Sequence, residues 1–205
     1  MSSSNLIRWG GLAAVVGGVS LIAQQIYALV APDPTSGGWV AVHTVGYIGL
    51  AFGLLGQVGL YARQMDKVAR LGLIGFLLGF IGNGLTAGAA FMNAFIVPVL
   101  TTQAPDLIAP TGPLFTGPLG LIILLAAVSV TLGFILFGLA TMRAGVLPRI
   151  AALLVVLSAW FGLAAVFSPI VFALGGIVFG LGNAWLGWAV WSGTTAESLK
   201  PAMAA

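Results

Sequence analysis

The hydrophobic pattern consists of long uncharged runs separated by short segments that carry all the charged residues. Each run is long enough, at about 1.5 Å per residue, to cross a hydrocarbon core of roughly 30 Å. The turn segments are rich in proline and glycine, which end helices. The pattern predicts six helices, at about residues 6–30, 39–61, 70–100, 119–142, 149–167 and 170–192.

The last uncharged run, residues 150–196, decides the number of helices. As a single helix it would be roughly 70 Å long, more than twice the thickness of the hydrocarbon core. Ser168 and Pro169 form the natural turn inside it. We therefore expect helices five and six to meet at this dipeptide.

The composition agrees with a membrane protein. The chain of 205 residues is 60% hydrophobic and 5% charged, with a mean hydropathy of +1.15, whereas soluble domains carry about 25% charged residues. We expect an all-α, polytopic bundle of six transmembrane helices in one domain, residues 1–205. Residues 9–30 are too long for the apolar core of a signal peptide, so they are predicted to stay as the first helix.

The charges predict topology and argue against other partners. In a six-helix arrangement all cations fall on one side: Arg8, Arg63, Lys67, Arg70, Arg143, Arg149 and Lys200. The opposite loops contain Asp33 and Asp106. By the positive-inside rule, both termini are expected in the cytoplasm and the protein in the plasma membrane. The net charge of +3 forms no basic patch, so no nucleic-acid partner is expected.

Small residues recur every three or four positions on the second, third and sixth predicted helices, which is typical of faces where membrane helices pack closely. We expect these three helices to contact one another, with the fourth facing lipid. Asn83 and Asn183 lie on these faces and could bond each other as a clamp. The predicted packing residues are Gly49, Gly53, Gly75, Gly79, Asn83, Gly180 and Asn183.

A weak internal repeat accompanies these faces. The odd helices begin alike at Arg8, Arg70 and Arg149, and the even helices end alike after Gly59, Gly138 and Gly187. Three helical hairpins of the same orientation would explain the similarity. Chance matches between apolar helix ends would explain it equally well.

No motif for catalysis is present, and all four carboxylates fall in predicted loops or tails. With no cysteine and one histidine, thiolate sites and a bis-histidine haem within one chain are excluded. His43 could contact a pigment, quinone or substrate, but we favour an interfacial histidine bonded to a loop carbonyl. Six polar residues are expected at one depth in the outer half, as a candidate ligand pocket or as interhelical hydrogen-bonding groups: Gln24, Gln25, Tyr27, His43, Tyr47 and Asn93.

Three short segments, LIRWGGLAA, GLYAR and AFIVPVLTTQAP, resemble small multi-pass bacterial membrane proteins, a resemblance that implies no activity. We expect a non-catalytic protein that binds an apolar ligand (lipid, quinone or pigment) or serves as an accessory subunit of a membrane complex. The expected partners are the lipid bilayer and another membrane protein, and the cofactor is unknown. The alternative is a transporter or channel for a small neutral or lipophilic molecule.

Overall fold

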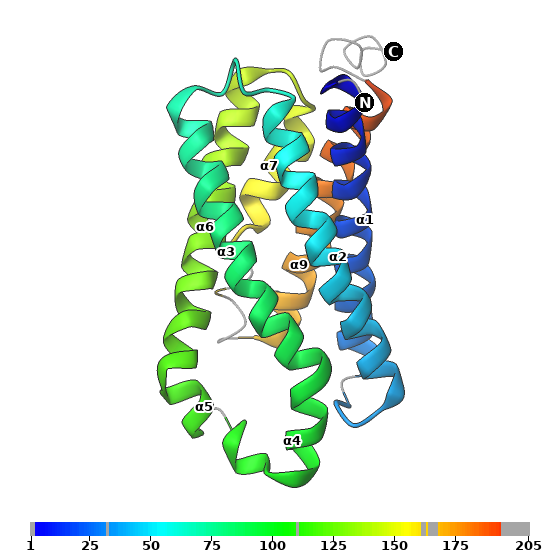
Figure 1. Ribbon diagram of the computed structural model, residues 1–205, viewed down its shortest axis with the longest axis vertical. Helices are drawn as coiled ribbons and strands as arrows, with labels where there is room; N and C mark the ends of the chain where they lie inside the picture. The colour runs from blue at the N-terminus through cyan, green and yellow to red at the C-terminus, as the bar shows by residue number, and fades with distance from the viewer. Residues whose placement is uncertain (1–2, 32, 110, 161–162, 164–167, 194–205) are drawn as a thin grey trace.

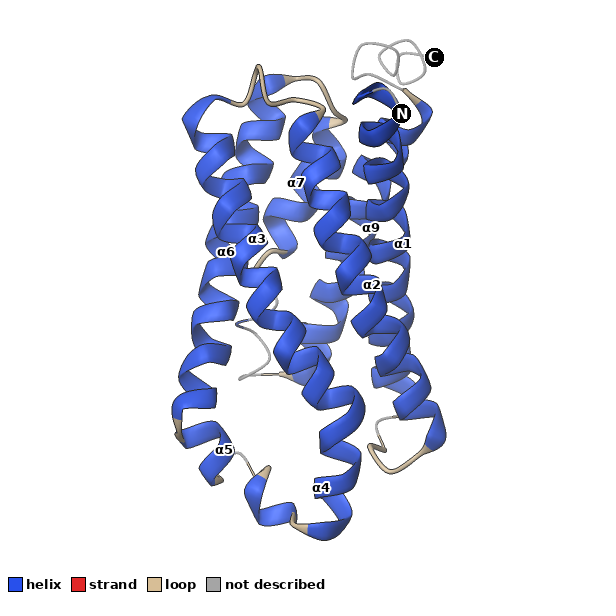
Figure 2. Ribbon diagram, viewed as in Figure 1, coloured by secondary structure: helices blue, strands red, loops and turns tan. Residues whose placement is uncertain are grey.

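The computed structural model describes residues 3–31, 33–109, 111–160, 163 and 168–193. Every regular element in these ranges is a helix, and no strand occurs in them (Figures 1 and 2). The elements are α1 (Ser3–Val30), α2 (Gly37–Ala62), α3 (Ala69–Phe91), the π-helix η1 (Met92–Ile96), α4 (Val97–Gln103), the 3₁₀-helix η2 (Pro105–Leu107), α5 (Pro113–Thr116), α6 (Pro118–Ala144), α7 (Arg149–Ser158) and α9 (Pro169–Ser192).

Five helical spans are long and apolar enough to cross a membrane, which indicates a multi-pass membrane protein. They are Ser4–Val30, Gly37–Ala62, Ala69–Gln103, Pro118–Ala144 and Pro169–Ser192. The predicted fifth helix, residues 149–167, corresponds to the shorter α7, and most of its second half lies outside the described residues. α9 begins at Pro169, one residue before the predicted start, and the Ser168 side chain caps it by accepting from the Val171 N–H.

The first and last described helices begin and end at the same end of the bundle (Figure 1). There the Arg8 side chain donates from Nε to the Trp191 carbonyl at 3.1 Å and lies over the Trp191 ring. The helix ends and loops that carry Arg63, Lys67, Arg70, Arg143 and Arg149 also lie at this end. We call it the cation-rich end and the opposite one the α4–α5 end.

Glycine allows the backbones of neighbouring helices to touch near the cation-rich end. A Cβ added at Gly10 would lie 2.6 Å from Gly59 Cα on α2, and one at Gly11 would lie 2.7 Å from the Gly187 carbonyl on α9. Real Cβ atoms essentially never come this close to another atom. α1 therefore packs backbone to backbone against both α2 and α9.

The predicted contacts among the second, third and sixth helices are wrong in their main partners. The most extensive packing of α3 is with α6, and that of α9 is with α1. Gly75 lies against the backbone of Phe137, and Gly79 against Gly133, so the leucine-rich α6 supplies the face on which α3 packs. A stripe of small residues indicates that a helix packs closely against a neighbour, but it does not identify which helix that neighbour is.

The two hairpins α1–α2 and α3–α6 show related packing. Gly17 follows Arg8 by nine residues and lies against Gly53, while Gly79 follows Arg70 by nine residues and lies against Gly133. In each of the first two predicted hairpins, the glycine nine residues after the arginine thus contacts a glycine of the next helix, although the two partner glycines do not occupy matching positions. The third hairpin, α7–α9, packs differently, with Gly182 against Val155.

The third helix changes its hydrogen-bond register before Pro98. Across the π turn η1, the Val97 N–H donates to the Met92 carbonyl instead of to Asn93. The next donor in that register would be Pro98, which has no N–H. The freed Asn93 carbonyl accepts from Trp39 Nε1 on α2 at 3.0 Å. Pro98 therefore does not end the helix, which continues through α4 to Gln103.

Candidate functional site

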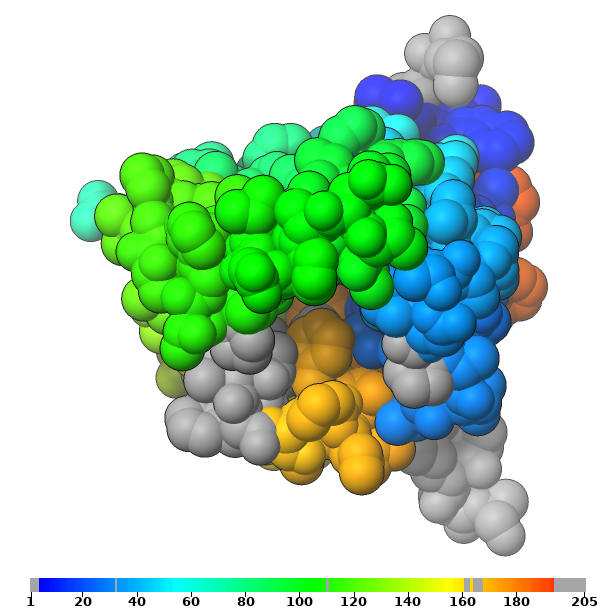
Figure 3. Space-filling model, turned by 90° about the horizontal axis from the view of Figure 1, so that it is seen from below, coloured from blue at the N-terminus to red at the C-terminus, as the bar shows by residue number. Residues whose placement is uncertain are grey.

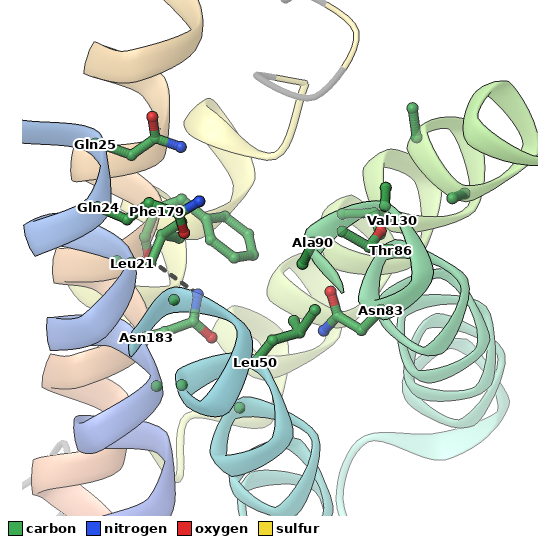
Figure 4. Close-up of a pocket in the computed structure, with 18 of the residues that line it drawn as sticks. Leu21, Gln24, Gln25, Leu50, Asn83, Thr86, Ala90, Val130, Phe179 and Asn183 are labelled. Atoms are coloured by element: carbon green, nitrogen blue, oxygen red, sulfur yellow. Dashed lines mark hydrogen bonds between the residues drawn. The ribbon is translucent and has the colours of Figure 1, made fainter. Parts of the chain in front are cut away.

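A cavity of about 370 Å³ lies inside the bundle. Its walls come from α1, α2, α3, η1, α6 and α9, and Phe115 of α5 also lines it. Most of the lining is glycine, alanine, leucine and phenylalanine, which suits an apolar molecule. The polar lining residues are all uncharged: Gln24, Gln25, Gln57, Asn83, Thr86, Asn93 and Asn183. We call this space the central cavity (Figure 4).

Three glutamines of the cavity wall lie on glycines of neighbouring helices. Gln25 occupies the space that a side chain at Gly176 of α9 would fill, with Cγ 2.8 Å from the position of its Cβ. Gln24 lies in the same way over Gly46 of α2, and Gln57 over Gly79 of α3. These glycines therefore leave room for amide side chains.

One chain of hydrogen bonds fixes the amides on the α3 side. Gln57 donates from Nε2 to the Phe76 carbonyl at 3.2 Å, and its Oε1 accepts from Asn83 Nδ2 at 3.2 Å. A backbone carbonyl can only accept, so the Gln57 nitrogen must face it. The Gln57 oxygen then faces Asn83, and Asn83 must turn its own nitrogen toward Gln57.

Asn183 is oriented from its own helix. Its Nδ2 donates to the Phe179 carbonyl one turn earlier at 2.9 Å. The sequence had suggested that Asn83 and Asn183 bond each other. In the structure each has a different partner, and they do not. Both nevertheless line the central cavity, from α3 and α9 respectively.

Some cavity amides have no hydrogen-bond partner in the described part of the protein, and Gln25 is the most deeply buried of these. Only 3% of the residue is exposed. Its side chain extends from α1 toward the cavity in Figure 4, on the side opposite Asn83. An amide in this position can bond a bound molecule without first breaking a bond inside the protein.

Half of the predicted outer polar cluster lines the cavity, namely Gln24, Gln25 and Asn93. The other three residues have contacts of their own. Tyr27 Oη lies 3.2 Å from Ser36 Oγ, and the Tyr47 ring packs edge-on against Phe91 and Phe95. These two side chains stabilise the α4–α5 end and are not among the lining residues.

His43 is buried, with 5% of its surface exposed, but it is not a lining residue. Its ring stacks on Trp39 at 3.8 Å between centroids. Nδ1 lies 2.9 Å from the Trp39 carbonyl, which can only accept, so Nδ1 carries the proton. The bonded carbonyl belongs to α2 itself and not to a loop.

Comparison with protein-family models, curated proteins and solved structures finds no match for this chain. The function is therefore argued from the geometry of the central cavity. Within the part of the chain that the structure describes, no three His, Asp or Glu side chains gather as metal ligands.

Sequence reasoning missed Gln57 and Thr86 as cavity residues. Gln57 follows Gly53 by four residues, so it continues the α2 face formed by Gly46, Gly49 and Gly53. Thr86 follows Asn83 by three residues on α3. Extending each small-residue stripe to the next polar residue would have found both.

Proposed function

We propose that this chain is a non-catalytic plasma-membrane protein that binds a small uncharged lipophilic molecule, such as a quinone, pigment or lipid, in the central cavity. The observation that carries the proposal is the lining: apolar walls with converging amides and, among the residues that the structure describes, no charged side chain. Such walls favour an uncharged ligand, because a charge would lose its hydration without gaining a counter-ion. The chain would act alone or as an accessory subunit of a larger membrane complex.

Six membrane spans with both termini in the cytoplasm fit this proposal. The Arg8–Trp191 contact brings the start of α1 and the end of α9 to one end, which supports an even number of crossings. α7 and the segment before α9 would form the sixth. The cation-rich end then faces the cytoplasm by the positive-inside rule, and Asp33 and Asp106 face outward.

This orientation can be tested with introduced cysteines, because the chain contains none. Thr35→Cys lies in the α1–α2 turn at the α4–α5 end, and Met65→Cys in the α2–α3 turn at the cation-rich end. A membrane-impermeant maleimide should label Thr35→Cys in intact cells and Met65→Cys only after permeabilisation. The reverse labelling would contradict the orientation.

The binding proposal is tested by filling the cavity. Gly53 lines the cavity, and a Cβ added there meets no atom within 4 Å, so a leucine would enter the cavity. Gly88 is the matched control, because it has equally open space but is exposed on α3 and is not a lining residue. Gentle purification followed by mass spectrometry and an absorption spectrum should find an uncharged lipophilic molecule with wild type and Gly88→Leu. Gly53→Leu should lose it. Equal retention in both variants, or no ligand in any, would contradict the proposal.

A transporter or channel for the same class of molecule is the second candidate. Seen from the α4–α5 end, the surface is hollowed between the segments around α4 and α5, α2 and α9 (Figure 3). The cavity lining includes Phe115 of α5, which lies toward this opening. If the opening is a route, Phe115→Ala should speed the flux of the identified ligand into proteoliposomes and Gly53→Leu should abolish it. Flux that is the same in both variants as in wild type would exclude this candidate.

A further inference from the structure

The central cavity offers oxygen atoms whose orientation is fixed by the protein. Asn83 directs Nδ2 to Gln57, and the structure shows no partner for its Oδ1. Asn183 directs Nδ2 to the Phe179 carbonyl, and its Oδ1 is likewise without a partner. Neither amide can be reversed without placing two oxygens against each other, because each chain of bonds ends on a backbone carbonyl.

The cavity's hydroxyl group follows the same pattern. Thr86 Oγ1 donates to the Gly82 carbonyl at 2.9 Å, so its only proton is used and its lone pairs remain. Each amide nitrogen has two N–H groups and each amide oxygen two lone pairs, so Asn83 and Asn183 each keep one free N–H beside two lone pairs, while Thr86 keeps lone pairs only. Among these three fixed groups, acceptor sites therefore outnumber free N–H groups. Gln25, which is buried and has no hydrogen-bond partner among the residues that the structure describes, adds one more carbonyl oxygen and one amide nitrogen on the α1 side.

From these orientations we infer that the ligand of the central cavity is an uncharged hydrogen-bond donor: a molecule with a hydroxyl group, such as an alcohol, phenol or quinol. This inference rests on the proposed binding function and adds the chemical class of the ligand. A hydroxyl donates to one of the fixed oxygens and also accepts from an amide N–H. A ketone or ether of the same shape leaves the oxygens unpaired, which is costly in a buried site.

A lipophilic ammonium ion also donates hydrogen bonds, but the cavity does not favour it. No carboxylate of the described part of the chain lines the cavity. The acidic residues in that part, Asp33, Asp66 and Asp106, all lie in the turns or short helices at the ends of the bundle. A cation would lose its hydration with no counter-ion to replace it. The neutral hydroxyl compound is therefore the class that the lining fits.

The test uses two probes that differ only in the donor, 4-tert-butylphenol and 4-tert-butylanisole. Dissociation constants for both are measured on purified wild-type protein in detergent and on three variants. Asn183→Leu removes one fixed oxygen. The double variant Gln57→Leu/Asn83→Leu removes the other, because Asn83→Leu alone would leave the Gln57 oxygen unpaired in the same place. Gln64→Leu is the control, because Gln64 is a buried amide outside the cavity whose Nε2 donates to Thr141 Oγ1 at 2.8 Å. Asn183→Leu and Gln64→Leu each lose one side-chain hydrogen bond.

Wild type and Gln64→Leu should bind the phenol more tightly than the anisole, by about five- to tenfold after correction for micelle partition. The ratio should fall toward one in Gln57→Leu/Asn83→Leu or in Asn183→Leu. Comparing the same two probes across variants cancels their different partition into micelles. Two sites are changed so that a folding defect in one variant leaves the other informative. A ratio that is the same in all proteins would overturn the inference and leave the binding proposal intact. Absence of saturable binding of either probe would remove the binding proposal itself and the inference with it.

Discussion

The tight crossing of α3 and α6 makes a quantitative prediction at Gly133. An alanine there would place its Cβ 2.5 Å from Gly79 Cα. Ordinary van der Waals contact begins at 3.4 Å, so the two backbones must separate by at least 0.9 Å, the difference between these distances. Because both neighbours are backbone, no side chain can rotate away. Forcing extra volume into a packed interface costs about 1–3 kcal/mol, and separating the helices also loses contacts at Gly75 and Gly82.

Alanine also favours the helix over glycine by up to about 1 kcal/mol. Gly88→Ala separates the two effects, because its Cβ would meet nothing within 4 Å. We expect Gly88→Ala to leave stability unchanged or slightly raised, and Gly133→Ala to lower it by roughly 1–2 kcal/mol net.

The assay is reversible unfolding in mixed micelles of a mild detergent and sodium dodecyl sulfate, followed by helical circular dichroism. Both variants are measured beside wild type, and the difference between them is the quantity of interest. Equal stability of Gly133→Ala and Gly88→Ala would refute the reasoning, because α3 and α6 would then not touch through their backbones at this point.

Two further substitutions test local geometry in the same assay. Ala69 begins α3 with φ +50°, in the left-handed region that L side chains rarely adopt. Ala69→Gly should therefore stabilise the protein by about 1 kcal/mol, and an unchanged or lowered stability would contradict that geometry. Trp39→Phe removes the donor to the Asn93 carbonyl and should cost about 1 kcal/mol or more. In a Pro98→Ala background, the new backbone N–H of residue 98 competes for the freed carbonyls, so Trp39→Phe should lower stability by less. Equal losses of stability in both backgrounds would show that Pro98 is not the cause of the π turn.

The helical character and most helix boundaries could be predicted because the bilayer imposes them. Lipid requires long uncharged runs, so the charges at Arg63, Arg70 and Arg143 mark where helices end or begin. The pairing of helices could not be predicted in this way. Gly79 can lie against any smooth face, and its partner Gly133 is in a helix whose sequence is dominated by leucine and other large residues.

The candidate site was predicted in part for a similar reason. Depth along the helix grouped Gln24, Gln25 and Asn93, because rise per residue is nearly constant, and all three line the central cavity. Depth does not give the direction in which a side chain points, so Tyr27 and Tyr47 were grouped with them although they pack elsewhere. Gln57 was missed because its role depends on reaching across to α3, which only the three-dimensional pairing reveals.

The contacts of α1 with its neighbours change in kind along its length. Toward the cation-rich end its small residues touch backbone: Gly10 meets Gly59, and Gly18 meets the Gly180 carbonyl. Toward the α4–α5 end, side chains come between the helices instead, with Gln24 over Gly46 and Gln25 over Gly176.

Away from the cation-rich end, the contact of α1 with its two neighbours thus runs through amide side chains, each of which fills the space over a facing glycine. The same two amides also line the central cavity. Gln24 and Gln25 therefore have two roles at once, because they pack against α2 and α9 and they bring polar groups to the cavity wall. A packing role and a binding role for these glutamines are thus not alternatives, since the same side chains serve both.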